Sequence, residues 1–445
     1  MHRILRELRP TLALAVPIIV GQVSQMLIGI TDSAMIGRVG TVELAAAAFT
    51  HGVFTVFFVT GLGLLFPVGV FTARDAGAER IVDCAAWLRH GRMVALGVGF
   101  GGFALLAFLS ARLHLFGQPA EVVEIMRPYL LLISLSLVPV FLFQVQRQFA
   151  ESMRRPWVPM VIMIGDVGLN ALLNWLFIWG HWGMPALGLT GSGVATLLAR
   201  CVAVVVLGVW LRRSATFAAV RKVPKAGWER KRFRELLGMG VPAAGSLLFE
   251  SGAFTAAALM MGWLGATQLA AHQIALSCAS LTFMFPLGLS IAVSMRVSRA
   301  LGEGRKESVR AMGFGALGLS SIVMLSFAMV FLFAGELLAR GFSVDPEVIA
   351  LAARLLAVAA IFQLFDGGQV VGSGALRGLT DVKVPTLITL IAYWGLAIPG
   401  GYLFGIRGGF GATAIWVALA AGLAFAAVFL GLRFRRLTVW SQTEA

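Results

Sequence analysis

Charged side chains are scarce in this sequence. Asp, Glu, Lys and Arg make up 13% of its 445 residues, while 59% are hydrophobic. A soluble protein carries about 25% charged residues, so the composition excludes an ordinary water-soluble fold. A transmembrane β-barrel is excluded as well, because its strands alternate apolar and polar residues and this sequence does not. Long apolar stretches instead indicate membrane-spanning helices, each of about 20 residues.

Cysteines are also few, and a nucleotide-binding motif is missing. The three cysteines, Cys84, Cys201 and Cys278, are widely spaced without a Cys-x-x-Cys pair, which excludes a disulfide framework and a cysteine metal site. No GxxxxGK[ST] sequence occurs, so the chain is not expected to hydrolyse ATP. His51 and His272 accompany no HExxH motif or recognisable nucleophile, which disfavours a membrane-embedded enzyme, the alternative from another functional class. We expect no enzyme and no cofactor.

Apolar stretches separated by charged or Gly- and Pro-rich breaks predict an all-α polytopic membrane protein. Twelve spans are expected, at residues 10–36, 44–72, 91–112, 127–147, 158–180, 190–212, 236–263, 267–295, 310–335, 347–372, 384–404 and 411–432. The even number places both termini on one side. Lys and Arg, which give the net charge of +15, gather at the termini and in loops after even-numbered spans, and such residues collect in the cytoplasm. Cytoplasmic termini in a bacterial inner membrane are therefore predicted.

The densest basic stretch, RKVPKAGWERKRFRE at residues 221–235, lies near the middle of the chain. It divides the sequence into an N-terminal lobe at 1–212, a basic cytoplasmic linker at 213–235 and a C-terminal lobe at 236–445. The linker is suited to anionic lipid head groups. Because no soluble domain presents a basic face, we expect membrane lipid as a partner and no nucleic acid.

The two lobes repeat one another when the sequence is shifted by 225 residues. Register partners are Gly37 and Gly262, Gly40 and Gly265, Gly63 and Gly288, Arg74 and Arg299, and Arg80 and Arg305. Six spans per lobe give both lobes the same orientation. The sequence thus predicts two pseudo-symmetric six-helix bundles, an arrangement typical of transporters with a site near the bilayer midplane.

Polar side chains inside the predicted spans are the candidates for that site. A charged group at a helix centre costs about 2.5–3.5 kcal/mol on insertion scales, so such residues are usually functional. The candidates are Gln25, Asp32, Asp166, Asn170, Asn174, Arg200, Glu250, His272, Gln273, Gln363, Asp366 and Gln369. Glu250 lies roughly 20 Å and Asp366 roughly 16 Å from the cytoplasmic face at 1.5 Å per residue. We therefore expect these two carboxylates at comparable depth.

The carboxyl pair belongs to the second lobe alone. The register partner of Glu250 is the uncharged Gln25, and Asp366 has no acidic counterpart in the first lobe. Two buried carboxylates can bind Na⁺ through hard oxygen ligands, take up a proton because burial favours the neutral acid, or hold an organic cation. Antiport follows if these uses exclude one another. The alternative is a buried acid that is merely hydrogen-bonded.

A purely structural role, without any part in transport, is the alternative at each polar position. This alternative carries more weight for Asp32, which lies near a helix end, than for Glu250 and Asp366. It carries most weight for Asp166, because an anion near a helix N-terminus is ordinary. His272 is interpreted as an interhelical hydrogen-bonding residue. The partner of Arg200, a carbonyl or an acid, is left open.

Several stretches together resemble the multidrug and toxic compound extrusion (MATE) transporters. They are DSAMIGRVG at 32–40, LNWLFIWGHWGMPALGLTGSGVAT at 173–196, LLFESGAF at 247–254, GATQLAAHQIAL at 265–276 and FDGGQVVGSGALRGLTDVKVP at 365–385. The resemblance covers nearly the whole chain. It implies two six-helix lobes forming a V, alternating access, and export of cationic or amphipathic small molecules by a monomer, driven by Na⁺ or H⁺ entry.

Within the family, the second-lobe acids are similar to the NorM-like branch. The resemblance implies that Glu250 and Asp366 are the cation-site acids, as Na⁺ ligands if the transport is sodium-coupled, and that Asp32 is the first-lobe acid found widely in the family. We predict that the cation or substrate site also includes Gln273, Gln25, Asn170, Asn174 and Gln363. Asn174 stands where the DinF-like branch usually has an aspartate, and this departure weakens a first-lobe cation site. AIFQLFD lacks the tyrosine often found before the Asp366 motif, which leaves the choice between Na⁺ and H⁺ open. A flippase for lipid-linked precursors or polysaccharides is the alternative within the superfamily.

Overall fold

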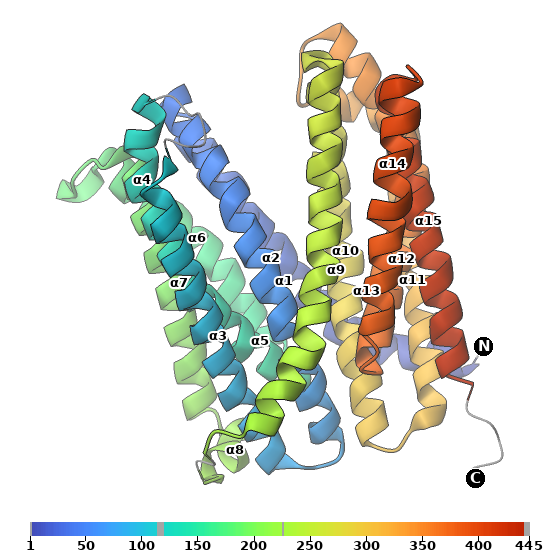
Figure 1. Cartoon of the computed structure of the whole chain (residues 1–445). Coiled ribbons are helices and arrows are strands. Elements are labelled where there is room, and N and C mark those ends of the chain that lie inside the picture. Colours follow the sequence, from blue (N-terminus) through green and yellow to red (C-terminus); the bar gives the residue numbers. More distant parts are fainter. Residues whose placement is uncertain (1, 114–119, 225–226, 440–445) are drawn as a thin grey trace. The chain divides into compact units, whose positions relative to one another are not determined.

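The computed structural model describes residues 2–113, 120–224 and 227–439, and these residues form helices without a strand (Figure 1). The first part of the chain contains α1 (His2–Ile36), α2 (Thr41–Gly77), α3 (Ile81–Ser110), α4 (Ala120–Leu135), α5 (Leu137–Ser152), α6 (Trp157–Trp179), η2 (His181–Gly183), α7 (Gly188–Arg213), η3 (Ala215–Phe217) and α8 (Ala218–Lys222). The second contains α9 (Arg230–Leu264), α10 (Ala266–Gly302), α11 (Lys306–Arg340), α12 (Pro346–Gly378), α13 (Lys383–Leu390), η4 (Ile391–Ala397), α14 (Ile398–Gly400), η5 (Gly401–Arg407) and α15 (Gly411–Leu437).

Twelve candidate membrane spans are found among the described residues, as the sequence predicts. The helices are longer than the predicted apolar spans, because a helix continues past the point where charged residues begin. Helix α9 already starts at Arg230, inside the predicted linker, which also contains α8 and residues 225–226 outside the described part. The fourth span is divided into α4 and α5 at Ser136, next to Pro139, which has no N–H for the carbonyl of Leu135.

The eleventh span is not a uniform α-helix. Residues 391–397 (η4) and 401–407 (η5) form π-helical turns on either side of the short α14. A π-helical turn adds a residue to the helical repeat and rotates the side chains that follow, and such turns occur frequently at functional sites. Hydropathy carries no signal for them.

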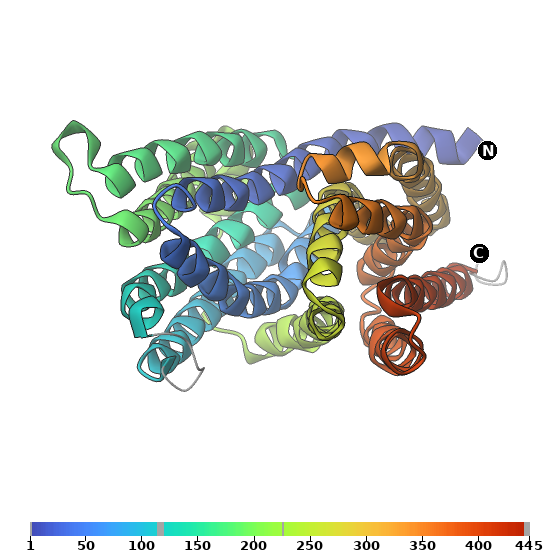
Figure 2. The ribbon, with the colours of Figure 1, turned by 90° about the horizontal axis from the view of Figure 1, so that it is seen from above.

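Contacts divide the chain into two compact units, residues 20–244 and residues 1–19 with 245–445. The boundaries fall inside α1 and α9 and are themselves register partners, since Ala244 follows Ile19 by 244 − 19 = 225 residues. In the unit of residues 245–445, α12 packs against α10, α11 and α15. In the unit of residues 20–244, α2, α3 and α5 pack together and α6 pairs with α7. The connection between α6 and α7 projects beyond its own bundle in both Figure 1 and Figure 2.

The repeat is visible in the turns as well as in the spans. Glu79 after α2 and Gly304 after α10 both have a positive φ, 59° and 74°, and they are 225 positions apart. The next residue closes the same hydrogen bond in each turn, from the N–H of Arg80 to the carbonyl of Asp75 and from Arg305 to Ala300, at 2.8 Å in both. The arginine register seen in the sequence therefore marks equivalent turns.

Glycines that the repeat places in register lie at equivalent helix crossings. A Cβ on Gly288 in α10 would come 2.9 Å from the Cα of Ile19 in α1, and a Cβ on Gly63 in α2 would overlap the backbone of Ala244 in α9. Only glycine permits backbones to approach this closely. In each unit, the first helix of one lobe therefore packs against the second helix of the other lobe through the same contact.

Candidate functional site

The structure brings Glu250 of α9 and Asp366 of α12 together in the unit of residues 245–445. Asp366 is buried, Glu250 is half-buried, and the two carboxylates interact electrostatically. Glu250 is hydrogen-bonded to the side chain of Gln369, one turn beyond Asp366, and lies within electrostatic range of Arg377. The cluster thus contains one more carboxylate than guanidinium.

Three further oxygens in this unit are buried without a hydrogen-bond partner among the described residues. They are Oε1 of Gln363, Oε1 of Gln369 and the hydroxyl of Tyr393. Gln363 uses its amide nitrogen to donate to the hydroxyl of Thr282 in α10, which leaves its oxygen available. Tyr393 is fully buried in the π-helical turn η4 and interacts electrostatically with both carboxylates. Carboxylate, amide and hydroxyl oxygens are hard ligands of the kind that alkali and alkaline-earth cations prefer.

The first-lobe candidates form a separate polar cluster in the unit of residues 20–244. Asp32 of α1 is 2% exposed and accepts hydrogen bonds from the amide of Asn174, at 2.6 Å, and the hydroxyl of Thr196, at 3.3 Å. Asn174 also donates to the side-chain oxygen of Asn170, at 3.2 Å. The carboxylate of Asp32 is therefore stabilised by amide and hydroxyl donors.

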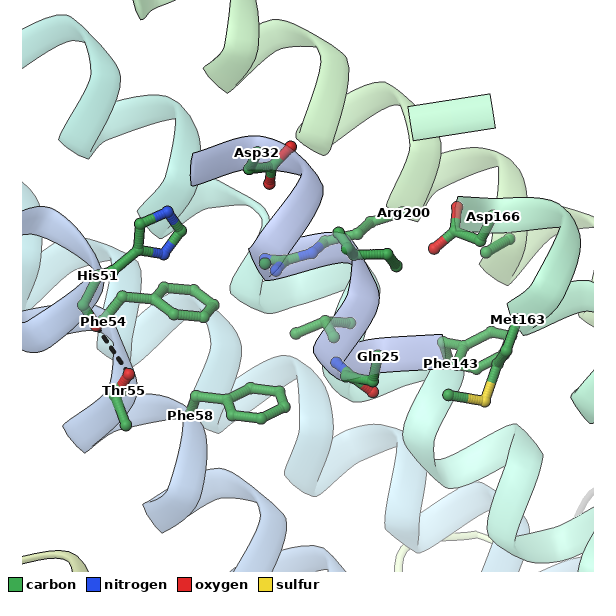
Figure 3. A pocket seen from close by; sticks show the side chains of 14 residues that line it. Gln25, Asp32, His51, Phe54, Thr55, Phe58, Phe143, Met163, Asp166 and Arg200 are labelled. Carbon is green, nitrogen blue, oxygen red and sulfur yellow. Dashed lines mark hydrogen bonds between the residues drawn. The ribbon is translucent and has the colours of Figure 1, made fainter. Parts of the chain in front are cut away.

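A pocket adjoins this cluster in the same unit (Figure 3). Its volume is about 170 Å³, and its walls include Gln25, Asp32, His51, Asp166 and Arg200. The sequence interpretation of Asp166 as a helix-terminal anion is not supported, because α6 begins at Trp157 and Asp166 lies well inside it, facing the pocket. The aromatic and apolar side chains that complete the pocket wall come from α1, α2, α5, α6 and α7.

Other predicted residues lie elsewhere. His272 of α10 is buried and accepts a hydrogen bond from the indole of Trp416 in α15, at 3.2 Å, which agrees with its interpretation as an interhelical hydrogen-bonding residue. The neighbouring Gln273 is exposed, and its place in a substrate site stays a prediction. Within the described residues, no group of three or more His, Cys, Asp and Glu side chains is arranged to hold a metal ion.

Sequence reasoning missed one member of these sites, Tyr393, and left the partner of another, Arg200, open. Tyr393 lies in a stretch that carries no charge, and only the absence of a tyrosine before Asp366 could have prompted a search for one on another helix. Arg200 had no partner that the sequence could identify. In the structure it donates to the hydroxyl of Ser136 and lies within electrostatic range of Asp32 and Asp166.

Comparison with known proteins agrees with this architecture. The MatE family model matches residues 17–176 and 242–403, and the second match begins 242 − 17 = 225 residues after the first, which confirms the repeat. The chain is 36% identical over 444 residues to the probable multidrug resistance protein NorM of Mesorhizobium japonicum, covering 97% of this chain and 94% of that protein. It is 37% identical over 438 residues to the protein of that name from Pseudomonas putida, covering 96% and 94%.

Solved structures show the same fold. The eukaryotic MATE transporter AtDTX14 superimposes with a TM-score of 0.88 at 20% identity, over 99% of this chain and 98% of that one. A MOP-superfamily transporter from Pyrococcus furiosus, whose binding pocket is described as having reverse polarity, superimposes with a TM-score of 0.86 at 19% identity, over 96% and 95%. The two matches of one family model, the full-length relatives and the shared fold establish that this integral membrane protein belongs to the MatE family of transporters.

Proposed function

We propose that the protein is a secondary active multidrug exporter that exchanges Na⁺ or H⁺ for organic cations by alternating access. The observation that carries this proposal is the meeting of Glu250 and Asp366 in a membrane-spanning bundle. Two carboxylates in such a place repel one another and lose hydration, so a cation or a proton that neutralises one of them is strongly favoured. Multidrug resistance is also the function named for the NorM relatives.

The surrounding groups support a single monovalent coupling ion. Arg377 offsets part of the charge on Glu250, which leaves about one negative charge on the pair. The unpartnered oxygens of Gln363, Gln369 and Tyr393 would complete the ligand set of Na⁺, while a proton would need only one carboxylate. The acidic character of this cluster disfavours a flippase, which would need cationic groups for phosphates. The chemistry is binding and release, with no enzymatic step.

The setting of the exporter is part of the proposal. We place it in the bacterial inner membrane with both termini in the cytoplasm, because the basic residues gather on that side. The substrates proposed are cationic or amphipathic small molecules. The protein is proposed to act as a monomer, with membrane lipid around it and no nucleic-acid partner.

Purified protein in liposomes tests the coupling. Na⁺ and H⁺ gradients are imposed separately, and the export of ethidium, a fluorescent cation, is followed. One of the two gradients is expected to drive export in the wild type. Glu250→Gln and Asp366→Asn should each reduce that export to the level of empty liposomes, because neutral side chains no longer require the ion. Export at the wild-type rate from either variant would contradict the site.

Glu336→Gln serves as the matched control for this experiment. Glu336 lies in the same unit, is exposed and pairs with Arg340 one turn later on α11. Removal of its charge is expected to leave export unchanged. Monodisperse elution of each variant in detergent shows that a loss of export is not a loss of folding.

A further inference from the structure

Two arginines of the unit of residues 20–244 lie close together at one end of its bundle. Arg92 belongs to α3 and Arg212 to the last turn of α7, and the charge of Arg212 acts on Arg92. After α7 the chain turns back, and α8 packs against α3 at that end (Figure 1). Phe217 of η3 fixes this turn, because it is buried against Phe149 of α5. Two cations held near one another repel.

Neither arginine has a partner among the residues that the structure describes. The side chains of Arg92 and Arg212 make no hydrogen bond or ion pair with any of these residues. Arg92 is half-buried, so part of its hydration is lost as well. Two acids at this end of the bundle are engaged elsewhere, since Asp83 and Glu229 both pair with Arg232, at 2.6 and 2.7 Å. A charge that is partly desolvated and unpaired is costly, so an anion from outside the chain would be favoured between the two arginines.

The repeat offers an internal comparison for this pair. The register partner of Arg92 is Leu317, since 317 − 92 = 225. At the end of α15, the last helix of the second lobe, Arg433 pairs with Asp381, with its Nε 2.9 Å from Oδ2. The second lobe thus has an apolar residue at one position and a paired arginine near the other. The two unpaired arginines are a feature of the first lobe and do not follow from the shared architecture.

Both arginines lie at the edge of the hydrocarbon region, on one side of the membrane. Arg92 is the second residue of the predicted span 91–112, and Arg212 is the last residue of the predicted span 190–212. A third span begins, and a sixth span ends, on the same side. Trp210, two residues before Arg212, is of a type enriched at this interface. Phospholipid phosphates lie at the same depth, just outside the roughly 30 Å hydrocarbon core.

Apolar side chains lead from each arginine into its membrane span. The exposed ones are Leu96 and Phe100 in α3 and Val205 and Val209 in α7. They are four and eight residues after Arg92, or seven and three residues before Arg212, spacings that place side chains on one face of a helix. Both helices pack against the same helix, α5. The surface thus combines a cationic end with apolar flanks.

We propose that Arg92 and Arg212 together bind the phosphate of one anionic phospholipid, with its acyl chains against the apolar side chains of α3 and α7. A guanidinium presents N–H donors in a fork that matches phosphate oxygens. Two such cations exceed the single negative charge of one phosphate and repel the ammonium group of a zwitterionic lipid, so a headgroup without a cation is preferred. The bound lipid joins α3 and α7 at this end. The site is separate from the basic linker at 213–235 and does not depend on the identity of the coupling ion.

Two lipids with the same chains test this preference. Dioleoylphosphatidylglycerol is anionic, and dioleoylphosphatidylcholine has the same phosphate with an added ammonium group. Binding of the first lipid molecule to the delipidated full-length protein in detergent is measured by native mass spectrometry. Phosphatidylglycerol is expected to bind at least about fivefold more tightly, because one basic residue near a membrane surface contributes about that factor for an anionic lipid. Inorganic phosphate, which has no chains, should not raise the thermal unfolding midpoint, whereas phosphatidylglycerol should.

Variants identify the residues that contact the headgroup. Arg92→Gln and Arg212→Gln should each weaken phosphatidylglycerol binding about fivefold and remove most of the preference between the two lipids. Arg92→Lys keeps the charge and should retain most of that preference. Arg435→Gln removes an exposed arginine from the last turn of α15 in the other unit and should leave the preference unchanged.

Equal binding of the two lipids by the wild type overturns the proposal, and so does a loss in Arg435→Gln as large as in Arg92→Gln, which would indicate unspecific surface charge. Stabilisation by inorganic phosphate equal to that by phosphatidylglycerol would assign the pair to free phosphate and not to lipid. Without lipid, Arg92→Gln should unfold at the wild-type temperature or higher, because one of two repelling charges is gone. A lower midpoint would show that a protein group holds Arg92 and would also contradict the site.

Discussion

At the scale of single residues, Tyr393 is the group that would complete the proposed ion site, and it comes from a helix that the sequence did not point to. The NorM-like pattern that the sequence resembles often has a tyrosine before the Asp366 motif, and this chain has Phe362 and Phe365 there. The structure instead presents a fully buried tyrosine from η4 to the same two carboxylates. Phe254 and Phe362 surround this part of the site with aromatic rings.

Tyr393→Phe is predicted to weaken the binding of the coupling ion without lowering the stability of the fold. The hydroxyl has no hydrogen-bond partner among the described residues, so its removal loses no native bond and relieves a desolvated group. If the oxygen is an ion ligand, the Na⁺ concentration for half-maximal export should rise about tenfold, equivalent to about 1.4 kcal/mol. The thermal unfolding midpoint in ion-free detergent should be equal or higher.

The exposed Tyr402 in η5 offers a matched control for that change. Tyr402→Phe removes the same hydroxyl from the same span, away from the carboxylates, and should leave the half-maximal Na⁺ concentration unchanged. A Tyr393→Phe protein with wild-type Na⁺ dependence would exclude the hydroxyl as a ligand. An unfolding midpoint lowered by the substitution would show instead that the hydroxyl has a structural partner.

At the scale of helices, glycine decides where two elements can cross. Gly63→Ala and Gly288→Ala are each predicted to destabilise the protein by roughly 1–3 kcal/mol, the usual cost of overpacking. The reason is that the added Cβ meets main-chain atoms of Ala244 or Ile19, which cannot move away as a side chain can. Thermal unfolding of the purified variants in detergent measures the effect, which should be similar for both because the crossings are equivalent.

Gly52→Ala is the control for these crossings. Gly52 lies in α2 like Gly63, but a Cβ there would meet nothing within 4 Å. The substitution should therefore raise stability slightly, by about 0.5–1 kcal/mol, because alanine favours the helix more than glycine does. A similar loss at Gly52 and Gly63 would mean that helix propensity, and not the crossing, governs both positions.

The helices also show what a sequence can and cannot predict. Apolar stretches located all twelve spans, and glycines and arginines in register revealed the repeat, because both signals are local in the chain. The division of the fourth span at Ser136 and the π-helical turns were not predicted from the sequence, because they depend on single backbone hydrogen bonds. The interpretation of Asp166 was wrong and the partner of Arg200 was left open, both for another reason. Whether a polar residue faces a cavity depends on how a helix is rotated against its neighbours, which hydropathy does not record.

At the scale of the whole molecule, the distribution of basic residues predicts the orientation in the membrane. The connection between α6 and α7 follows an odd-numbered span and contains Trp182, 79% exposed. The turn between α10 and α11 follows an even-numbered span and contains Arg305. The next residue, Lys306, is exposed at the start of α11. If the termini are cytoplasmic, these two sites lie on opposite sides of the membrane.

Cysteine labelling distinguishes the two orientations. The three native cysteines, none of them in a disulfide, are first replaced by alanine, and Trp182→Cys or Lys306→Cys is then introduced. A membrane-impermeant maleimide should label Trp182→Cys in intact spheroplasts and Lys306→Cys only in everted vesicles. The cysteine-free protein sets the background. The reverse pattern would place the termini outside, and the basic loops would then face the periplasm against the bias that normally sets orientation.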